Sequence, residues 1–277
     1  MKTTLAPEEG TQSAGMHPSQ TAVVVFSDAF AHRNGVGAYY SDLLGHLRKQ
    51  MRAAELVCPG LTAEGKPQGL TLPLPGDKTQ RLSLPGIPKA FRTMRRVRPD
   101  VVVLASPGPY GILGLFLAKC WGVPLITGYH TQYDKLVGLY WNRVFGGISS
   151  RYCRWVDRQL FRASAAVITN SMSIHDDACR MTSREVVLVG TPVDPGFLAQ
   201  PAPLARERFG PVLFAGRLAA EKNLDAVIDA ARRLTDVDFI IAGEGPLRDT
   251  VERAAAECAN VAYLGWLSRE ELAEKLD

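Results

Sequence analysis

Short apolar runs alternate with longer amphipathic segments along most of the 277-residue sequence. Runs such as 21–27 and 101–104 are rich in β-branched residues and have the length of a strand, which is typical of parallel strands that are buried on both faces. The segments between such runs have the apolar spacing of helices. Because this alternation places parallel strands in one sheet with helices on its faces, the sequence predicts a doubly wound α/β fold.

The alternation occurs in two series, which predict two domains. Residues 1–20 are polar and without an apolar stretch, so we expect a disordered leader there. The first domain is predicted over residues 21–190, a turn-rich linker over 191–205 and the second domain over 206–277. Strands are expected at residues 21–27, 54–58, 101–104, 124–127, 165–169, 186–189, 212–215, 237–241 and 260–264.

Helices are expected between these strands, together with one long irregular connection. The connection covers residues 59–88 and contains one short strand near 70–72. The aromatic side of the helix at 140–162 is expected to pack in the core. The remaining helices are predicted to follow Gly37 and to lie at residues 89–98, 111–120, 172–180, 223–234, 246–257 and from Ser268, which with Glu271 has the pattern of a capping box.

Net charge and cysteine content bear on the ligand, the cellular compartment and the presence of a metal site. The formal net charge of +4 permits an acidic ligand or an anionic membrane surface and requires neither. The basic helix at 89–98 could rest on anionic lipid, although an ordinary solvated face is the commoner explanation. Five scattered cysteines without a C-x-x-C pair indicate a reducing, cytoplasmic environment, and no metal site is expected.

The turn between the predicted strand at 212–215 and its helix carries two cations, Arg217 and Lys222. A helix also presents unpaired N–H groups and the positive end of its dipole at such a turn, so a diphosphate could bind there. The glycine spacing and the Lys-Ser/Thr pair of a P-loop are absent. Taken alone, the two side chains are equally well explained as solvated loop charges.

Three other connections lie at strand ends where ligands bind in open α/β sheets. Gly35 and Gly37 stand in a loop that could bring backbone close to a phosphate, although most such loops are simply turns. A lone histidine is usually structural, but His130 follows the strand at 124–127, and at that place it could act as a neutral donor or stabilise developing charge. Between strand and helix in the second domain, Gly243 and Gly245 would let a ligand approach closely, with Pro246 in the first helical turn.

Taken together, these motifs resemble the retaining glycosyltransferases of the two-Rossmann-domain type called GT-B, in particular family 4. The resemblance covers residues 21–277 and is closest to the subgroup that uses GDP-mannose or a UDP-sugar with lipid-linked acceptors. It rests on the ordered set Asn34-Gly-Val-Gly37, Ala105-Ser-Pro-Gly-Pro109, Tyr129-His-Thr131, Pro192-Val-Asp194, Phe214-Ala-Gly-Arg-Leu218, Glu221-Lys-Asn223 and Gly243-Glu-Gly-Pro246.

The resemblance implies a hexosyltransferase that moves a mannose- or glucose-type sugar, with retention, from a nucleotide-diphosphate sugar to a lipid or glycan acceptor. Arg217 and Lys222 would neutralise the diphosphate, and His130 would approach the reacting centre from the acceptor side. The resemblance implies a GDP-sugar or UDP-sugar as donor substrate, and it implies neither a cofactor nor a metal ion. The implied donor-binding set is Gly35, Gly37, Gly216, Arg217, Lys222, Gly243, Glu244, Gly245, Leu264 and Gly265.

One departure from the family pattern lies near Asp277. Only three strand–helix units follow the linker, whereas a doubly wound domain usually has about five or six strands. The family's two glutamates, eight positions apart, are not matched by Glu270, Glu271 or Glu274. The second domain is therefore expected to be incomplete, and a non-catalytic nucleotide-sugar-binding or partner protein of the same fold is the alternative function. An NAD-dependent oxidoreductase and a nucleic-acid-binding protein have little support, since neither fingerprint is present.

Overall fold

The computed structural model describes residues 17–31, 34–62, 67–74, 77–132, 134–135, 143–194, 197 and 210–275. Most of the predicted leader and much of the predicted linker at 191–205 lie outside these ranges, so both remain predictions. The last leader residues, Pro18–Gln20, form a 3₁₀ turn. Within the described residues, the helices lack the combination of length and apolar character that crossing a membrane requires.

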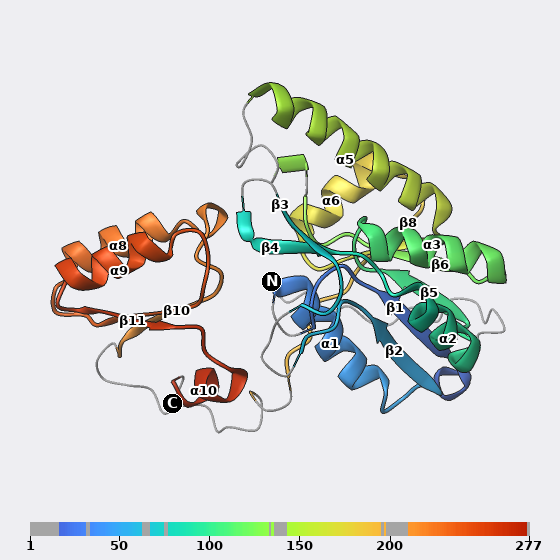
Figure 1. The fold of residues 1–277 in the computed structure, drawn as a ribbon, viewed down its shortest axis with the longest axis horizontal. Helices are drawn as coiled ribbons and strands as arrows, with labels where there is room; N and C mark the ends of the chain where they lie inside the picture. The colour runs from blue at the N-terminus through green and yellow to red at the C-terminus, as the bar shows by residue number, and fades with distance from the viewer. Residues whose placement is uncertain are drawn as a thin grey trace, which may run out of the picture.

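A six-stranded parallel sheet forms the first domain, as the alternation predicts (Figure 1). Its strand order is β2-β1-β5-β6-β7-β8. The strands are β1 (Ala22–Phe26), β2 (Ala53–Val57), β5 (Val101–Leu104), β6 (Leu125–Gly128), β7 (Ala166–Thr169) and β8 (Glu185–Leu188). The helices of this part are α1 (Gly35–Leu47), α2 (Ile87–Val97), α3 (Pro109–Trp121), α5 (Arg143–Ala163) and α6 (Met172–Met181).

The central strand β1 shows why the sheet needs helices on both faces. Val24 and Phe26 point into a core that is shared with α2, α3 and α5, whereas Val23 and Val25 face α1. All five residues of β1 are buried. An unbroken apolar strand is stable only in such a doubly covered position.

The second domain contains a three-stranded parallel sheet with the order β11-β10-β9. Helices α8 and α9 lie on one side of this sheet and the short helix α10 on the other (Figure 1). The Ser268–Glu271 capping box that the sequence predicts is present at the start of α10. The elements are β9 (Val212–Ala215), the 3₁₀ turn η2 (Ala220–Lys222), α8 (Leu224–Arg233), β10 (Phe239–Ala242), α9 (Arg248–Glu257), β11 (Val261–Gly265) and α10 (Arg269–Glu274).

A charged contact joins the two parts of the chain. The guanidinium group of Arg269, at the start of α10, donates to both carboxylate oxygens of Asp42 on α1, at 2.6 and 2.9 Å. It also donates to Asp194, which follows β8, at 2.9 Å. A planar guanidinium that meets a carboxylate with two parallel hydrogen bonds fixes orientation as well as distance, so this contact sets how α10 meets α1.

Three local predictions are wrong. The connection at 59–88 contains an antiparallel pair, β3 (Thr71–Leu74) and β4 (Asp77–Ser83), where one strand is expected. Helix α1 already begins at Gly35, so Gly35 and Gly37 are helical residues. Helix α9 begins at Arg248, and Pro246 therefore lies in the preceding turn.

The aromatic side of α5 packs in the core only in part, which differs from the sequence prediction. Ile148, Tyr152 and Trp155 are each more than half exposed, and the rings of Tyr152 and Trp155 stack with their centroids 6.2 Å apart. Phe161, which belongs to the same stripe, is buried as predicted, together with Leu160. The remaining aromatic residues of that stripe, at 141 and 145, have no described side chain.

Candidate functional site

The carboxyl edge of the first sheet holds a partly buried carboxylate that the sequence analysis did not identify. Asp28 follows β1, and its Oδ2 accepts a hydrogen bond from the Ser106 hydroxyl at 2.7 Å. Its Oδ1 accepts from the backbone N–H of Tyr110, in the first turn of α3, at 2.8 Å. Burial raises the pKa of Asp28, and these hydrogen bonds oppose the shift. The positive end of α3 is thus occupied by the protein's own carboxylate.

His130 lies at the same edge, just beyond β6, as the sequence predicts. Its Nε2 is 2.8 Å from the hydroxyl of Tyr40, a residue of α1. Burial lowers the pKa of His130 to about 4, although a hydrogen bond with Asn170 acts in the opposite direction. The imidazole is therefore neutral at physiological pH, and its role as a donor stays a prediction.

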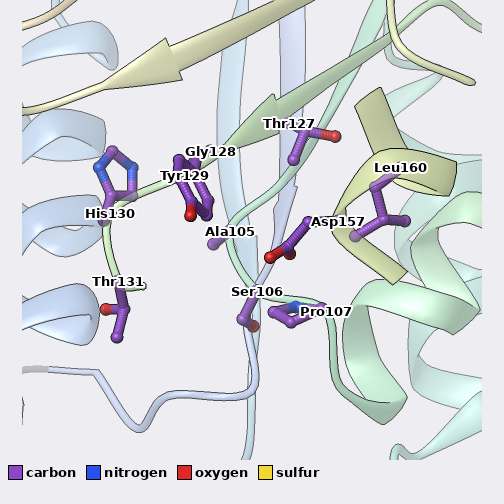
Figure 2. A pocket seen from close by; sticks show the side chains of 10 residues that line it. All are labelled: Ala105, Ser106, Pro107, Thr127, Gly128, Tyr129, His130, Thr131, Asp157 and Leu160. Carbon is purple, nitrogen blue, oxygen red and sulfur yellow. The ribbon is translucent and has the colours of Figure 1, made fainter. Parts of the chain in front are cut away.

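A small cavity lies between the ends of β5 and β6 and helix α5, and His130 is part of its wall (Figure 2). Asp157 of α5 contributes a carboxyl group that is only 3% exposed. Among the described residues, its Oδ2 has no hydrogen-bond partner. Burial, with the nearby negative charges of Asp134 and Asp177, raises the pKa of Asp157 to about 7, and Arg154 opposes this. A single polar residue in a helix gives no sequence signal of such a position.

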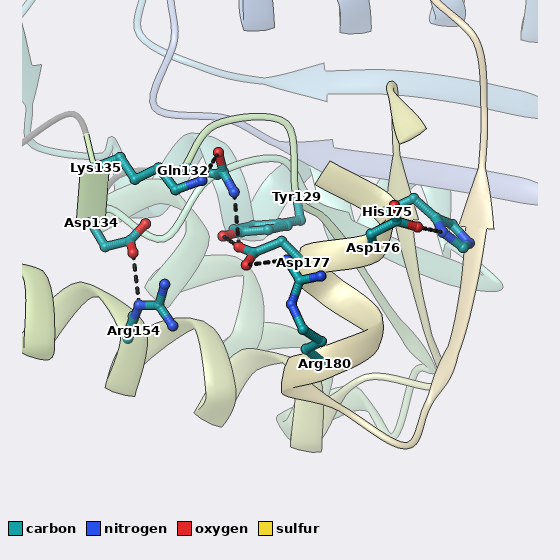
Figure 3. A network of polar contacts seen from close by, with 9 residues as sticks. All are labelled: Tyr129, Gln132, Asp134, Lys135, Arg154, His175, Asp176, Asp177 and Arg180. Carbon is teal, nitrogen blue, oxygen red and sulfur yellow. Dashed lines mark hydrogen bonds and ion pairs between the residues drawn. The ribbon is translucent and has the colours of Figure 1, made fainter. Parts of the chain in front are cut away.

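A polar network braces the segment that carries His130 (Figure 3). The buried hydroxyl of Tyr129 donates to Asp177 of α6 at 2.9 Å, and the side-chain amide of Gln132 donates to the same oxygen at 3.0 Å. Arg154 of α5 donates to Asp134 at 2.7 Å. These contacts attach the segment to both α5 and α6, so His130 stands on a fixed support.

The glycines of the first loop are placed differently from the prediction. The N–H of Gly37 donates to the side-chain oxygen of Asn34 at 2.8 Å, so the Asn34 side chain caps helix α1 and the Gly37 N–H is already paired within the protein. A methyl group at Gly37 would overlap the backbone carbonyl of Phe30, whereas space at Gly35 is open. Gly37 is therefore required by packing between α1 and the segment that precedes it.

The carboxyl edge of the second sheet carries the two predicted cations. Arg217 follows β9, and its Nε donates to Glu221 at 3.1 Å. Lys222 ends the 3₁₀ turn and is exposed. Helix α8 then begins at Leu224 without a side chain that caps its first turn. Two cations and the positive end of a ten-residue helix thus meet at one turn.

Backbone loops interlock beside this turn. Gly243 has φ = +143°, and a methyl group there would overlap the carbonyl of Gly216. A methyl group at Gly245 would likewise overlap the carbonyl of Leu218. The two loops are joined by the hydrogen bond from Leu218 N–H to the carbonyl of Glu244, at 3.0 Å. Packing between the loops is thus sufficient to require both glycines, and the close ligand approach that the sequence suggests stays a prediction.

The rest of the predicted donor-binding set lines the same edge. The N–H of Gly243 donates to the carbonyl of Gly265 at 2.7 Å, and Gly265 has φ = +70°. The carboxylate of Glu244 pairs with Arg248 at 3.4 Å, and Leu264 is 40% exposed. The structure therefore brings the second-domain members together at one edge and places His130, Gly35 and Gly37 with the first sheet. Across the described ranges, no cluster of three or more His, Cys, Asp or Glu residues is placed to hold a metal ion.

Comparison with known families agrees with this architecture. The sequence model described as Glycosyltransferase Family 4 matches residues 33–197, and the model described as Glycosyl transferases group 1 matches residues 200–277. The first of these matches covers more than half of the chain. The chain belongs to glycosyltransferase family 4.

Two curated relatives and one solved structure show how far the similarity to known proteins extends. The sulfoquinovosyl transferase SQD2 of Arabidopsis thaliana is 24% identical over 93% of the chain and 53% of its own length. A GDP-mannose-dependent alpha-mannosyltransferase of Mycobacterium tuberculosis is 28% identical over 91% of the chain and 69% of its own length. The S. aureus MnaA–UDP structure has a TM-score of 0.55 at 12% identity and covers 93% of this chain and 71% of that one, a likeness of fold. The chain thus spans little more than half of the first relative.

Proposed function

We propose that this chain is part of a nucleotide-sugar-dependent glycosyltransferase, and that the carboxyl edge of its second sheet binds the diphosphate of the donor. The observation that carries the proposal is the turn after β9, where Arg217 and Lys222 flank the start of α8. The side chain of Asn223, the N-cap residue, makes no capping hydrogen bond among the described residues, so the N–H groups of the first two helical residues can face an anion. The names of the relatives, which are sugar transferases, support the same function.

The transferred group in this proposal is a hexose of mannose or glucose type, and the reaction retains the anomeric configuration. When the bond between the anomeric carbon and the phosphate oxygen breaks, negative charge grows on the diphosphate. Arg217, Lys222 and the helix dipole are placed before the reaction, so they stabilise that charge without reorganisation. The neutral His130 belongs to the other sheet edge, on which the acceptor would bind.

Titration calorimetry of the 277-residue chain with GDP and UDP tests the diphosphate site. Replacement of both cations, Arg217→Ala with Lys222→Ala, should weaken nucleotide binding about 100-fold or more, because each charge-assisted hydrogen bond contributes roughly 1.5–3 kcal/mol. The matched control is Arg232→Ala with Arg233→Ala, which removes two positive charges from the other end of α8. Equal losses in both double variants would indicate a nonspecific charge effect, and unchanged affinity in the first would refute the site.

We further propose a lipid or glycan acceptor and peripheral contact with an anionic membrane through α2. Ile87 and Phe91 of this helix are 60% and 45% exposed, and Arg92 and Arg95 are exposed on the same helix. Apolar side chains beside arginines are typical of helices that lie in the interface of anionic lipid. Co-sedimentation with phosphatidylglycerol vesicles tests this contact, since Arg92→Glu with Arg95→Glu should release the chain and Arg232→Glu with Arg233→Glu should not.

A further inference from the structure

The imidazole of His130 is enclosed by groups from several parts of the first sheet's edge. The Tyr39 ring lies against it with a centroid separation of 4.4 Å, and the Tyr40 ring meets it edge-on at 5.3 Å. Tyr40 has no exposed surface, so its hydroxyl must satisfy its hydrogen bonds inside the protein. The partner that it finds is Nε2 of His130, at 2.8 Å.

The sequence around this contact is built to admit the Tyr40 hydroxyl. Gly128 ends β6, and a methyl group in its place would overlap both the Tyr40 hydroxyl and Nε2 of His130. The neighbouring hydroxyl of Tyr39 does not serve the ring, because it donates to the carbonyl of Val189 at 3.3 Å. Two adjacent tyrosines of α1 therefore have different hydrogen-bond partners, and of these two it is Tyr40 whose hydroxyl contacts the imidazole.

The second ring nitrogen of His130, Nδ1, lies next to a buried acceptor. Nδ1 of His130 and Oδ1 of Asn170, just beyond β7, are both buried polar atoms that have no other partner among the described residues, and Asn170 lies within hydrogen-bonding reach of the ring. A proton on Nδ1 would pair these two atoms with each other. Buried polar atoms are rarely left unpaired, and this arrangement also leaves Nε2 free to accept from Tyr40.

We propose that Tyr40 and Asn170 are positioning residues that hold His130 in its Nδ1–H tautomer, through a relay in which Tyr40 donates to Nε2 and Nδ1–H donates to Asn170. Both ring nitrogens are then committed within the protein. The imidazole serves as a fixed brace for the segment 128–131 and carries no proton to or from a substrate. Its importance for sugar transfer rests on the function proposed above, whereas the relay itself does not.

Nitrogen-15 NMR of the histidine rings in the 277-residue chain measures tautomer and titration directly, without donor or acceptor. A His130→Gln variant assigns the His130 signal among the five histidines. The wild-type ring should be neutral at pH 7 and protonated on Nδ1. In Tyr40→Phe, the neutral ring loses its donor, so the titration midpoint should rise by about one pH unit and the Nε2–H tautomer should appear.

Two further variants keep the test specific. Tyr39→Phe removes the adjacent hydroxyl and should leave the tautomer and midpoint of His130 unchanged. Asn170→Asp supplies a carboxylate to Nδ1–H and should raise the midpoint above that of the wild type, because an opposite charge favours the imidazolium. A wild-type Nε2–H tautomer, a lower midpoint in Tyr40→Phe, or equal effects of Tyr39→Phe and Tyr40→Phe would overturn the proposal.

Nucleotide binding separates this inference from the proposed function. GDP or UDP affinity should be the same in Tyr40→Phe and in the wild type, since the cations and α8 lie on the other sheet. If the chain binds neither nucleotide while the NMR results hold, the donor-site proposal fails and the relay stands. If both nucleotide binding and the NMR signals of His130 respond to Tyr40→Phe, the relay is not an independent unit and the inference fails.

Discussion

The carboxyl edges of the two parallel sheets are built in different ways. At the first edge, buried side chains form the structure: Asp28 accepts hydrogen bonds from Ser106 and from the start of α3, and Tyr40 contacts His130. At the second edge, backbone loops pack on one another at Gly243 and Gly245. The first edge joins buried side chains from different elements, whereas the second places Arg217, which is paired with Glu221, and the exposed Lys222 beside the start of α8.

This difference has a consequence for what each edge can do. Buried polar side chains make the first edge rigid and sensitive to protonation, because an unpaired or charged group is costly there. Glycine-based packing makes the second edge sensitive to added side-chain volume. Substitutions that change only the protonation of a buried group, or only the volume of a side chain, test this difference between the two edges.

The largest expected effect is the pH dependence that Asp157 confers. Its pKa is raised from 3.8 to about 7, so between about pH 4 and pH 7 the folded chain holds a proton that the unfolded chain has released. Stability should therefore fall as pH rises through this window, by on the order of 4 kcal/mol at most. Asp157→Asn cannot ionise, and urea denaturation at pH 5 and pH 8 should show most of that dependence lost.

Asp176→Asn is the matched control, since that carboxylate is largely exposed on α6. It should leave the difference between pH 5 and pH 8 unchanged. If Asp157→Asn retains the wild-type dependence, the buried carboxyl does not control the first edge.

Gly243→Ala should act on the second edge. The φ of +143° disfavours alanine, and the new methyl group would overlap the carbonyl of Gly216, so we expect a loss of about 3 kcal/mol. Hydrogen exchange should become faster in β9 and β10 and stay unchanged in β1 and β5. Gly45→Ala, on α1 with open space around it, should instead stabilise by about 0.5–1 kcal/mol. Faster exchange in both sheets would show that the two edges do not respond separately.

The sequence predicts the elements of this fold well where apolar runs decide them. The strands β1, β5 and β9 match their expected ranges within one residue, because buried parallel strands require continuous apolar side chains. The strand β4 is not predicted, since Asp77–Ser83 is mostly polar and lacks the alternation of a strand. Tyr152 and Trp155 of α5 are misassigned, because helical spacing does not distinguish an exposed stripe from a buried one.

The candidate site could be predicted only in part, because some of its residues are far apart in the sequence. Arg217 and Lys222 lie within one turn, so their convergence can be inferred locally. Asp28 and Tyr110 are 82 positions apart, and Tyr40 and His130 are 90 positions apart, so only the folded sheet brings them together. The packing partners of Gly243 and Gly37 are likewise backbone atoms of other loops, which a sequence pattern does not specify.

The smallest expected effects on stability come from removing one tyrosine hydroxyl at each edge. Tyr129→Phe removes a buried hydroxyl that donates to the carboxylate of Asp177 at 2.9 Å, and should cost about 2 kcal/mol because a charged acceptor loses a donor. Tyr263→Phe removes a hydroxyl that donates to the neutral carbonyl of Gly243 at 3.1 Å, and should cost about 1 kcal/mol. Urea denaturation of both variants measures the difference. A loss at Tyr263 equal to or larger than that at Tyr129 would mean that the second edge also depends on side-chain hydrogen bonds, and the contrast between a side-chain edge and a backbone edge would no longer hold.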